Sequence, residues 1–194
     1  MKTTTSAEDS ALRELVASID EAVALPDAQR QTAAIKRILS DAIRSGGVPL
    51  GERFYVPKPD CYARRLLHRD VERGWSAVVM TWGPGQGTPL HDHAGIWCVE
   101  GTVHGEMEVI QYEIADRDAN ARYRFEPRGR VRALPGASGA LIPPFEYHVL
   151  RNALDDAVSV TLHVYGGEMD RCHVFEPEPD GWHRRERKPL HYDA

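Results

Sequence analysis

The chain has 194 residues and a net charge of −5, from 24 Lys and Arg against 29 Asp and Glu, with nine His. This length suits one domain or one domain with a helical extension, and the negative charge argues against a nucleic-acid partner. No apolar run approaches the ~20 residues that span a bilayer, and the polar N-terminus does not resemble a secretory signal. The three cysteines form no CxxC pair, so we expect a reducing, cytoplasmic location.

The first 45 residues predict two amphipathic helices. Apolar residues recur at steps of three and four from Ser10 to Val23, which is the helical period. Pro26 interrupts this pattern, Asp27 can cap a second helix, and Gly46-Gly47 would end it. We therefore expect a helical segment, 1–45, packed on a domain formed by 46–194, the two parts making a single structural unit.

The remaining chain predicts a mainly β fold. Gly and Pro separate short runs rich in Val, Ile, Thr, Tyr and Trp, which is typical of a sandwich or barrel. The expected strands are Ser76–Trp82, Ile96–Glu100, His104–Ile114, Tyr123–Phe125, Val131–Leu134, Ala140–Ile142, Tyr147–Arg151, Val158–Tyr165 and Cys172–Phe175. The polar, locally basic tail from Gly181 onward is expected to be a solvated surface segment.

Two histidines, His91 and His93, follow a glycine-rich turn. Residues two apart in an extended strand share a face, so both imidazoles can grip one metal ion while Asp92 points away. Imidazole is a common ligand of Fe, Zn, Cu and Ni. The alternative is a pair of surface histidines beside a turn.

His148 is the third candidate ligand, at the start of an expected strand after Pro143-Pro144. A barrel can bring it within reach of His91 and His93. Three nitrogen ligands leave coordination positions open, which is a catalytic rather than a closed structural arrangement.

The expected strand Val158–Tyr165 places Thr161, His163 and Tyr165 on one face. If that face lines a barrel interior, its hydroxyl, imidazole and phenol can relay hydrogen bonds beside the metal. The alternative is a half-exposed strand with its polar face in water.

The spacing of these residues resembles the cupin superfamily. Gly85, His91, His93 and Gly105 fit its first motif, and Cys98 stands in the slot of its metal-binding acid; the second motif is matched by Pro143, His148 and Asn152, with Phe145 in place of a glycine. This resemblance implies a cupin-type β-barrel, a double-stranded β-helix similar to a jelly roll, with the N-terminal helices added to it.

The departure at Cys98 resembles the cysteine dioxygenase family of thiol dioxygenases, over roughly residues 55 to 175. The similar segments are Tyr62-Ala63-Arg64, the Trp82–Gly85 approach, the two motifs, and Thr161-x-His163-x-Tyr165. The resemblance implies that His91, His93 and His148 hold Fe(II), that Tyr165 points its phenol at the open positions, that His163 hydrogen-bonds this phenol, and that Thr161 supports His163. It also implies that Cys98 and Tyr165 can form a thioether cross-link.

The same resemblance implies a small thiol carboxylate and O₂ as substrates. Arg64, helped by Tyr62, would hold the carboxylate bidentately, although the adjacent Arg65 leaves the register open by one residue. A surface arginine in an Arg-rich helix or turn is the alternative. L-cysteine, oxidised to cysteine sulfinic acid in cysteine catabolism, is the expected substrate.

Two rival functions stay open. The segment His163–Gly167 looks closer to the relatives that use 3-mercaptopropionate. A non-catalytic cupin binding Zn or Ni is the other alternative. We expect no nucleic-acid or membrane partner, and the oligomeric state is left open.

Overall fold

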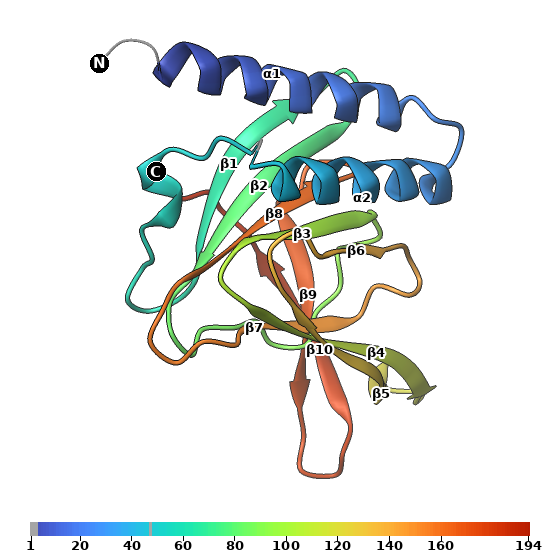
Figure 1. The fold of residues 1–194 in the computed structure, drawn as a ribbon. Helices are drawn as coiled ribbons and strands as arrows, with labels where there is room; N and C mark the ends of the chain where they lie inside the picture. Colours follow the sequence, from blue (N-terminus) through green and yellow to red (C-terminus); the bar gives the residue numbers. More distant parts are fainter. Residues whose placement is uncertain (1–3, 47) are drawn as a thin grey trace.

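The computed structural model describes residues 4–46 and 48–194, so Gly47, one of the two glycines expected to end the second helix, lies outside the described residues. Two helices and a short 3₁₀ turn precede two β-sheets (Figure 1). The elements are α1 (Thr4–Val23), α2 (Ala28–Arg44), η1 (Glu52–Tyr55), β1 (Ala63–Asp70), β2 (Trp75–Trp82), β3 (Cys98–His104), β4 (Met107–Arg117), β5 (Arg122–Ala133), β6 (Ser138–Leu141), β7 (His148–Asn152), β8 (Ser159–Tyr165), β9 (Arg171–Pro177) and β10 (His183–Pro189).

Both predicted helices are present. The Asp27 side chain caps α2 by accepting a 2.8 Å hydrogen bond from the backbone N–H of Arg30, as an N-cap does. Gly46 follows the helix with a φ of +69°, a left-handed backbone that favours glycine. Helix α1 begins at Thr4, earlier than expected, because neither glycine nor proline interrupts the chain before Ser10. Neither described helix is long and apolar enough to cross a membrane.

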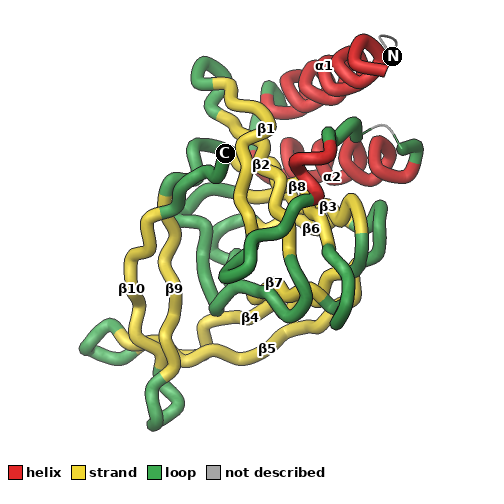
Figure 2. The backbone as a smooth tube through the Cα atoms, turned by 90° about the vertical axis from the view of Figure 1, so that its left-hand side faces the viewer, coloured by secondary structure: helices red, strands yellow, loops and turns green. Residues whose placement is uncertain are grey.

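The helices cover the outer face of the first sheet (Figure 2). Ile35 and Leu39 of α2 are fully buried in one cluster with Val160, Leu162 and Val164 of β8. Gly101 of β3 allows this approach, because a Cβ there would lie 2.9 Å from Cδ1 of Ile43. The division of the chain into a helical segment, 1–45, and a domain, 46–194, stays a prediction.

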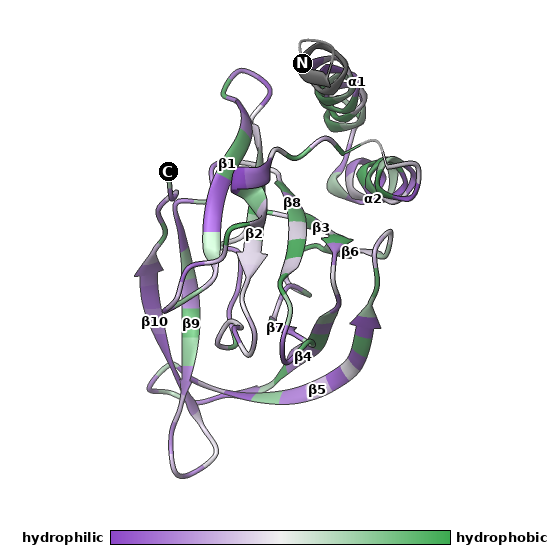
Figure 3. Ribbon diagram, turned by 60° about the vertical axis from the view of Figure 1, so that its left-hand side comes forward, coloured by the Kyte–Doolittle hydropathy of each residue, from purple (hydrophilic) through white to green (hydrophobic). Residues whose placement is uncertain are grey.

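The two sheets have the strand orders β1-β2-β8-β3-β6 and β7-β4-β5-β10-β9. The predicted mainly β fold with N-terminal helices is confirmed, although the described strands stay in two sheets and do not close into one barrel. Figure 3 shows hydrophobic colour on β8 and β3 beneath the helices and hydrophilic colour along β10. All of β8 is buried, because its valine face packs under the helices and its polar face points between the sheets; the half-exposed alternative is therefore wrong.

The segment Ala63–Asp70, for which an Arg-rich helix or turn was the alternative prediction, forms strand β1. Arg64 and Arg65 are buried in this strand, whereas Arg69 is exposed. Arg65 donates to the carbonyls of Val56 (3.0 Å) and Ala194 (3.2 Å) and to Oγ1 of Thr81 (3.3 Å). A search for alternating apolar residues misses this strand, because two of its buried side chains are arginines.

Strand β5 unites two predicted strands, Tyr123–Phe125 and Val131–Leu134. Proline and glycine between them predicted a break, but the register with β4 slips there, from Gln111 opposite Gly129 to Tyr112 opposite Pro127. This bulge absorbs one extra residue and lets the strand continue.

The C-terminal tail lies at the surface as expected, with most of its side chains exposed, but it is an ordered strand of the second sheet. Residues His183–Pro189 form β10, which pairs with β9 over its whole length. Beyond it, the backbone N–H of Asp193 donates to the carbonyl of Arg64 at 2.7 Å. The side chains of β10 can be charged because most of them are exposed to water. Its backbone pairs with β5 and β9 in the second sheet.

Replacing Leu39 with alanine tests the packing of α2 on the sheet. Leu39 is 0% exposed, so Leu39→Ala should lower the free energy of unfolding by about 2–5 kcal/mol through lost burial and a residual cavity. Leu134→Ala, at a 58% exposed leucine, should change it by less than about 0.5 kcal/mol. Urea unfolding measures both, and equal effects would contradict the packing.

Candidate metal centre

Three histidines from two distant segments converge between the sheets. His91 and His93 lie in the connection between β2 and β3, and His148 begins β7. His91 and His148 exchange both backbone hydrogen bonds, N–H to O, at 3.2 and 3.3 Å. One ligand atom from each of the three imidazoles lies within 4.8 Å of the others. This isolated bridge gives the extended geometry that the HxH pattern predicted.

The spacing of the nitrogens suits a metal ion. Nε2 of His148 lies 3.2 Å from Nε2 of His91. Two imidazole nitrogens that bind one ion at about 2.1 Å each lie about 3.0–3.4 Å apart. The site is a three-histidine metal-binding site, and its donors fit a divalent transition metal.

Glycines and Asn152 hold the connecting segments in place. Gly85 and Gly105 have φ values of +71° and +75°, and at Gly105 a Cβ would lie only 2.7 Å from the carbonyl oxygen of Val158. The side-chain amide of Asn152 donates to the carbonyls of Trp82, Gly83 and Ala157 at 2.8–3.1 Å. The end of β7 is thereby tied to the end of β2, where the histidine segment starts.

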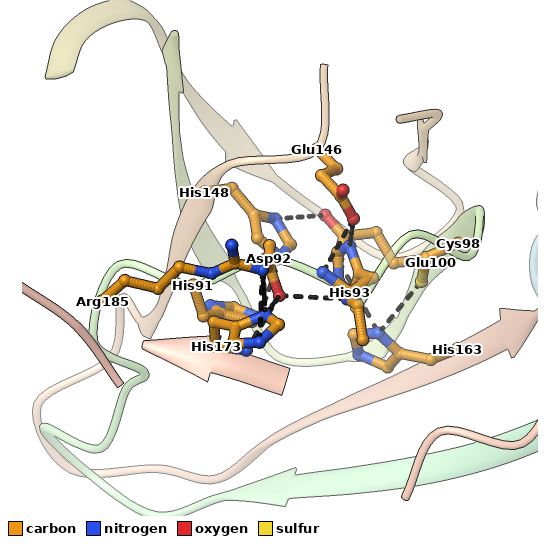
Figure 4. A network of polar contacts seen from close by, with 11 residues as sticks. His91, Asp92, His93, Cys98, Glu100, Glu146, His148, His163, His173 and Arg185 are labelled. Atoms are coloured by element: carbon orange, nitrogen blue, oxygen red, sulfur yellow. Dashed lines mark hydrogen bonds and ion pairs between the residues drawn. The ribbon is translucent and has the colours of Figure 1, made fainter. Parts of the chain in front are cut away.

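Nδ1 of each of the three imidazoles lies within 3.8 Å of an oxygen atom, and Figure 4 shows the contacts of His93 with Glu146 and of His148 with Glu100. Nδ1 of His91 lies 3.1 Å from the carbonyl of Pro89, Nδ1 of His93 lies 3.8 Å from Glu146 Oε2, and Nδ1 of His148 lies 3.8 Å from Glu100 Oε1. The carbonyl of Pro89 holds Nδ1 of His91 and leaves its Nε2 for a metal, whereas Nδ1 of His93 and Nδ1 of His148 have no hydrogen-bond partner among the described residues.

Burial keeps the site free of imidazolium charge. Desolvation lowers the pKa of His91 and lowers the pKa values of His93 and His148 well below 6.5, with mutual repulsion among the imidazoles adding to the shifts of the last two. Neutral imidazole is the form that binds metal. Desolvation also raises the pKa of Glu100 to about 8, so the acid beside the site resists ionisation.

The polar face of β8 forms a line of contacts beside the histidines. Oγ1 of Thr161 accepts from Nε1 of Trp82 at 2.9 Å and lies 2.8 Å from Nε2 of His163. The ring of His163 stacks on that of Tyr165 with centroids 6.0 Å apart. Nδ1 of His163 faces the Cys98 sulfur at 3.9 Å, so the hydrogen bond from His163 to the phenol stays a prediction.

Cys98 and Tyr165 are direct partners in the register of β3 with β8. Both are buried, at 0% and 2% exposure. Burial raises the pKa of the Cys98 thiol and of the Tyr165 phenol well above their usual values, so both keep their protons near neutral pH. The thioether between them stays a prediction, for which this pairing supplies the proximity.

Arg64 and Tyr62 line the same pocket as the three histidines, His163 and Tyr165. The Arg64 guanidinium donates from Nη2 to the carbonyl of Met169 at 2.6 Å, and its Nε and Nη1 are buried without a partner among the described residues. Arg65 points to the opposite face of β1 and does not line this pocket. Alternation along the strand therefore selects Arg64 as the arginine of the site, and a surface position for it is wrong, since it is 4% exposed.

Four contributors were not anticipated from the sequence. Glu100 and Glu146 approach the histidines, as described above. The ring of Tyr192 lies 4.7 Å from the Arg64 guanidinium carbon, and Oδ2 of Asp193 accepts the backbone N–H of Arg64 at 2.8 Å. Glu100 could have been found, because it shares a strand face with Cys98; no sequence pattern indicates that the tail folds back over Arg64.

The family model for cysteine dioxygenase type I matches residues 1–178. The chain belongs to the cysteine dioxygenase type I family. Among curated relatives, cysteine dioxygenase type 1 of Rattus norvegicus is 22% identical over 59% of this chain, and that of Homo sapiens is 24% identical over the same share. The match spans 56% of each of these two relatives, about half of their length.

A solved structure of an uncharacterised conserved protein with a double-stranded β-helix domain from Klebsiella pneumoniae is also similar. It has a TM-score of 0.44 and 15% identity, covering 61% of this chain and 88% of that chain. Residues 179–194 of this cysteine dioxygenase family member, which include β10 and the tail over Arg64, lie beyond the segment that the family model matches.

Substitution of a single histidine tests the metal centre. His91→Ala should abolish stoichiometric metal binding, because two imidazoles rarely retain an ion that three hold. The control is His104→Ala, which removes an imidazole at the far end of β3. Metal content after anaerobic Fe(II) loading and desalting measures the effect, and full occupancy in His91→Ala would contradict the assignment.

Proposed function

We propose that this chain is a non-haem Fe(II) thiol dioxygenase, which adds both atoms of O₂ to the sulfur of L-cysteine and forms cysteine sulfinic acid. The supporting observation is the shared pocket of three neutral imidazoles and one buried, partly unpartnered guanidinium. Family membership adds support for a thiol substrate and O₂. Activity in the cytoplasm stays a prediction.

His91, His93 and His148 would hold the iron, which when bound would supply thiolate coordination and O₂ activation. Neutral ligands favour an anionic thiolate as a further ligand, because they leave the charge of the ion uncompensated. The residues of the chain then have to place the thiol next to the open positions.

Arg64 is the proposed anchor for the substrate carboxylate. Its Nε and Nη1 have no partner among the described residues and are buried, and a guanidinium binds a carboxylate bidentately through two such N–H groups. The carbonyl of Met169 and the ring of Tyr192 hold the guanidinium in place. Because the carboxylate and the thiol belong to one small molecule, holding the carboxylate also restricts the position of the sulfur. Such positioning accelerates a reaction by holding the reacting atoms close together.

Tyr165, supported by His163 and Thr161, is the proposed donor to the reacting oxygen. Its phenol keeps its proton because burial raises its pKa, and a donor aimed at developing charge stabilises it in a dry site. Tyr62 also keeps its proton, since burial raises its pKa to about 12, and it can donate to the carboxylate beside Arg64.

A second candidate substrate is 3-mercaptopropionate. Among the described residues that line the pocket there is no Asp or Glu, so no side-chain carboxylate pairs with the ammonium group of cysteine. A thiol acid without an amino group, such as 3-mercaptopropionate, would therefore give up no ion pair with a side chain of this pocket. The shared requirement of both substrates is the carboxylate at Arg64.

Oxygen uptake with a panel of thiols tests the proposal. Protein loaded anaerobically with Fe(II) should consume O₂ and form sulfinate with cysteine or 3-mercaptopropionate, and much less with cysteamine, which lacks a carboxylate. Faster turnover of 3-mercaptopropionate would favour the second candidate. Background uptake with every thiol at full metal occupancy would contradict the dioxygenase and support a non-catalytic metal-binding role.

Arg64→Ala should raise KM for the thiol carboxylate by about 10- to 150-fold, the equivalent of about 1.5–3 kcal/mol for charged hydrogen bonds. Its iron content should be unchanged, because Arg64 is not a ligand. Arg65→Ala is the matched control, which should keep KM while lowering stability. The reverse pattern, with KM raised by Arg65→Ala alone, would contradict Arg64 as the anchor.

A further inference from the structure

Glu100 is a buried acid that the proposed reaction does not use. It lies two residues after Cys98 on β3, so both side chains point between the sheets. Its cross-strand partners are His163 on β8 and Gly139 on β6. Only 9% of Glu100 is exposed, and burying a carboxyl group is costly unless it is partnered.

The two oxygens of Glu100 face two different imidazoles (Figure 4). Oε1 lies 3.8 Å from Nδ1 of His148, and Oε2 lies 3.7 Å from Nδ1 of His163. Among the described residues, Nδ1 of His148, which faces Oε1, and Oε2 of Glu100, which faces His163, are both buried without a hydrogen-bond partner. A donor and an acceptor left over on facing side chains point to a hydrogen bond that needs a shift of less than about 1 Å to form.

Glu100 has room for this shift. It lines a cavity of about 160 Å³ together with Met107, Leu141 and Leu150. Across the strand pair, a Cβ at Gly139 would lie 3.8 Å from Cγ of Glu100, so no neighbouring side chain from β6 crowds the carboxyl group.

The comparison with Glu146 shows why Glu100 stands out. Oε2 of Glu146 lies 3.8 Å from Nδ1 of His93, but it already accepts the backbone N–H of His93 at 2.8 Å. Glu146 therefore has a structural task in the loop, whereas among the described residues the carboxyl group of Glu100 makes no hydrogen bond that would compete with His148. Glu100 is also not a fourth ligand, because it approaches the nitrogen that faces away from the cluster.

We propose that Glu100 is a positioning residue of the metal centre, which accepts the Nδ1–H of His148 and so fixes its Nε2 as the metal ligand. Its second oxygen orients His163. A carboxyl oxygen that accepts the outer N–H of a metal-bound imidazole holds the ring in place, and loss of such a partner typically costs 10–100-fold in metal affinity. The inference rests on the metal site of the proposed function and not on the identity of the thiol.

Metal affinity of Glu100 variants tests this inference. Glu100→Leu removes the acceptor at similar volume, and Glu100→Gln keeps one weaker acceptor. The expected dissociation constant for Fe(II), from anaerobic competition with a chelator, rises about 10- to 100-fold in Glu100→Leu and by less in Glu100→Gln. Glu126→Gln, an exposed acid on β5, is the matched control and should bind as the wild type does.

Thermal unfolding of the metal-free proteins separates positioning from folding. Glu100→Leu should unfold no earlier than the wild type, since it removes a desolvated carboxyl group. Wild-type affinity in both Glu100 variants would overturn the proposal, and so would an affinity loss matched by a large fall in metal-free Tm. Because neither assay contains thiol or O₂, a protein that binds metal through Glu100 but consumes no O₂ would contradict only the proposed function.

Discussion

The site depends on one backbone interaction, the reciprocal pairing of His91 with His148. These residues are 57 positions apart, and their two N–H to O hydrogen bonds bring the loop after β2 against the start of β7. Because the pairing fixes both backbones, the two imidazoles meet with Nε2 atoms 3.2 Å apart. The Asn152 amide at the far end of β7 and the left-handed glycines at positions 85 and 105 hold the strands that make this pairing.

Burial then sets the chemistry of the site. Desolvation lowers the pKa values of the histidines and raises those of Tyr165, Cys98 and Glu100, so nearly every group in the pocket is neutral near pH 7. Arg64 is the buried exception, and its neighbours are a carbonyl oxygen and the face of Tyr192. A pocket with neutral metal-binding imidazoles, the buried cation of Arg64 and the lysine Lys188 in its lining favours an anionic ligand that also binds a metal.

An acid, Glu100, lies near the metal-binding histidines on the same strand as Cys98. Cys98 occupies the slot that an acid fills in the general cupin motif, and Glu100 stands one pleat further on the same face of β3. That step of two residues places the carboxyl group behind His148 instead of beside its Nε2. The same strand thus offers a thiol next to Tyr165 and an acid next to the imidazoles, because strand periodicity sends both side chains inward.

The sequence by itself determined the local features: the helical periods, the Asp27 cap, most of the strands, and the HxH pair with its distant third histidine. These follow from short-range spacing, and so does the shared face of Thr161, His163 and Tyr165. Only the tertiary structure placed Arg64, and not Arg65, in the pocket of the histidines, revealed β1 and β10, and brought Tyr192 and Asp193 onto Arg64. These features depend on contacts between residues far apart in the chain, such as the hydrogen bonds of the buried arginines and the pairing of β10 with β9. Contacts of this kind leave no periodic pattern in the sequence.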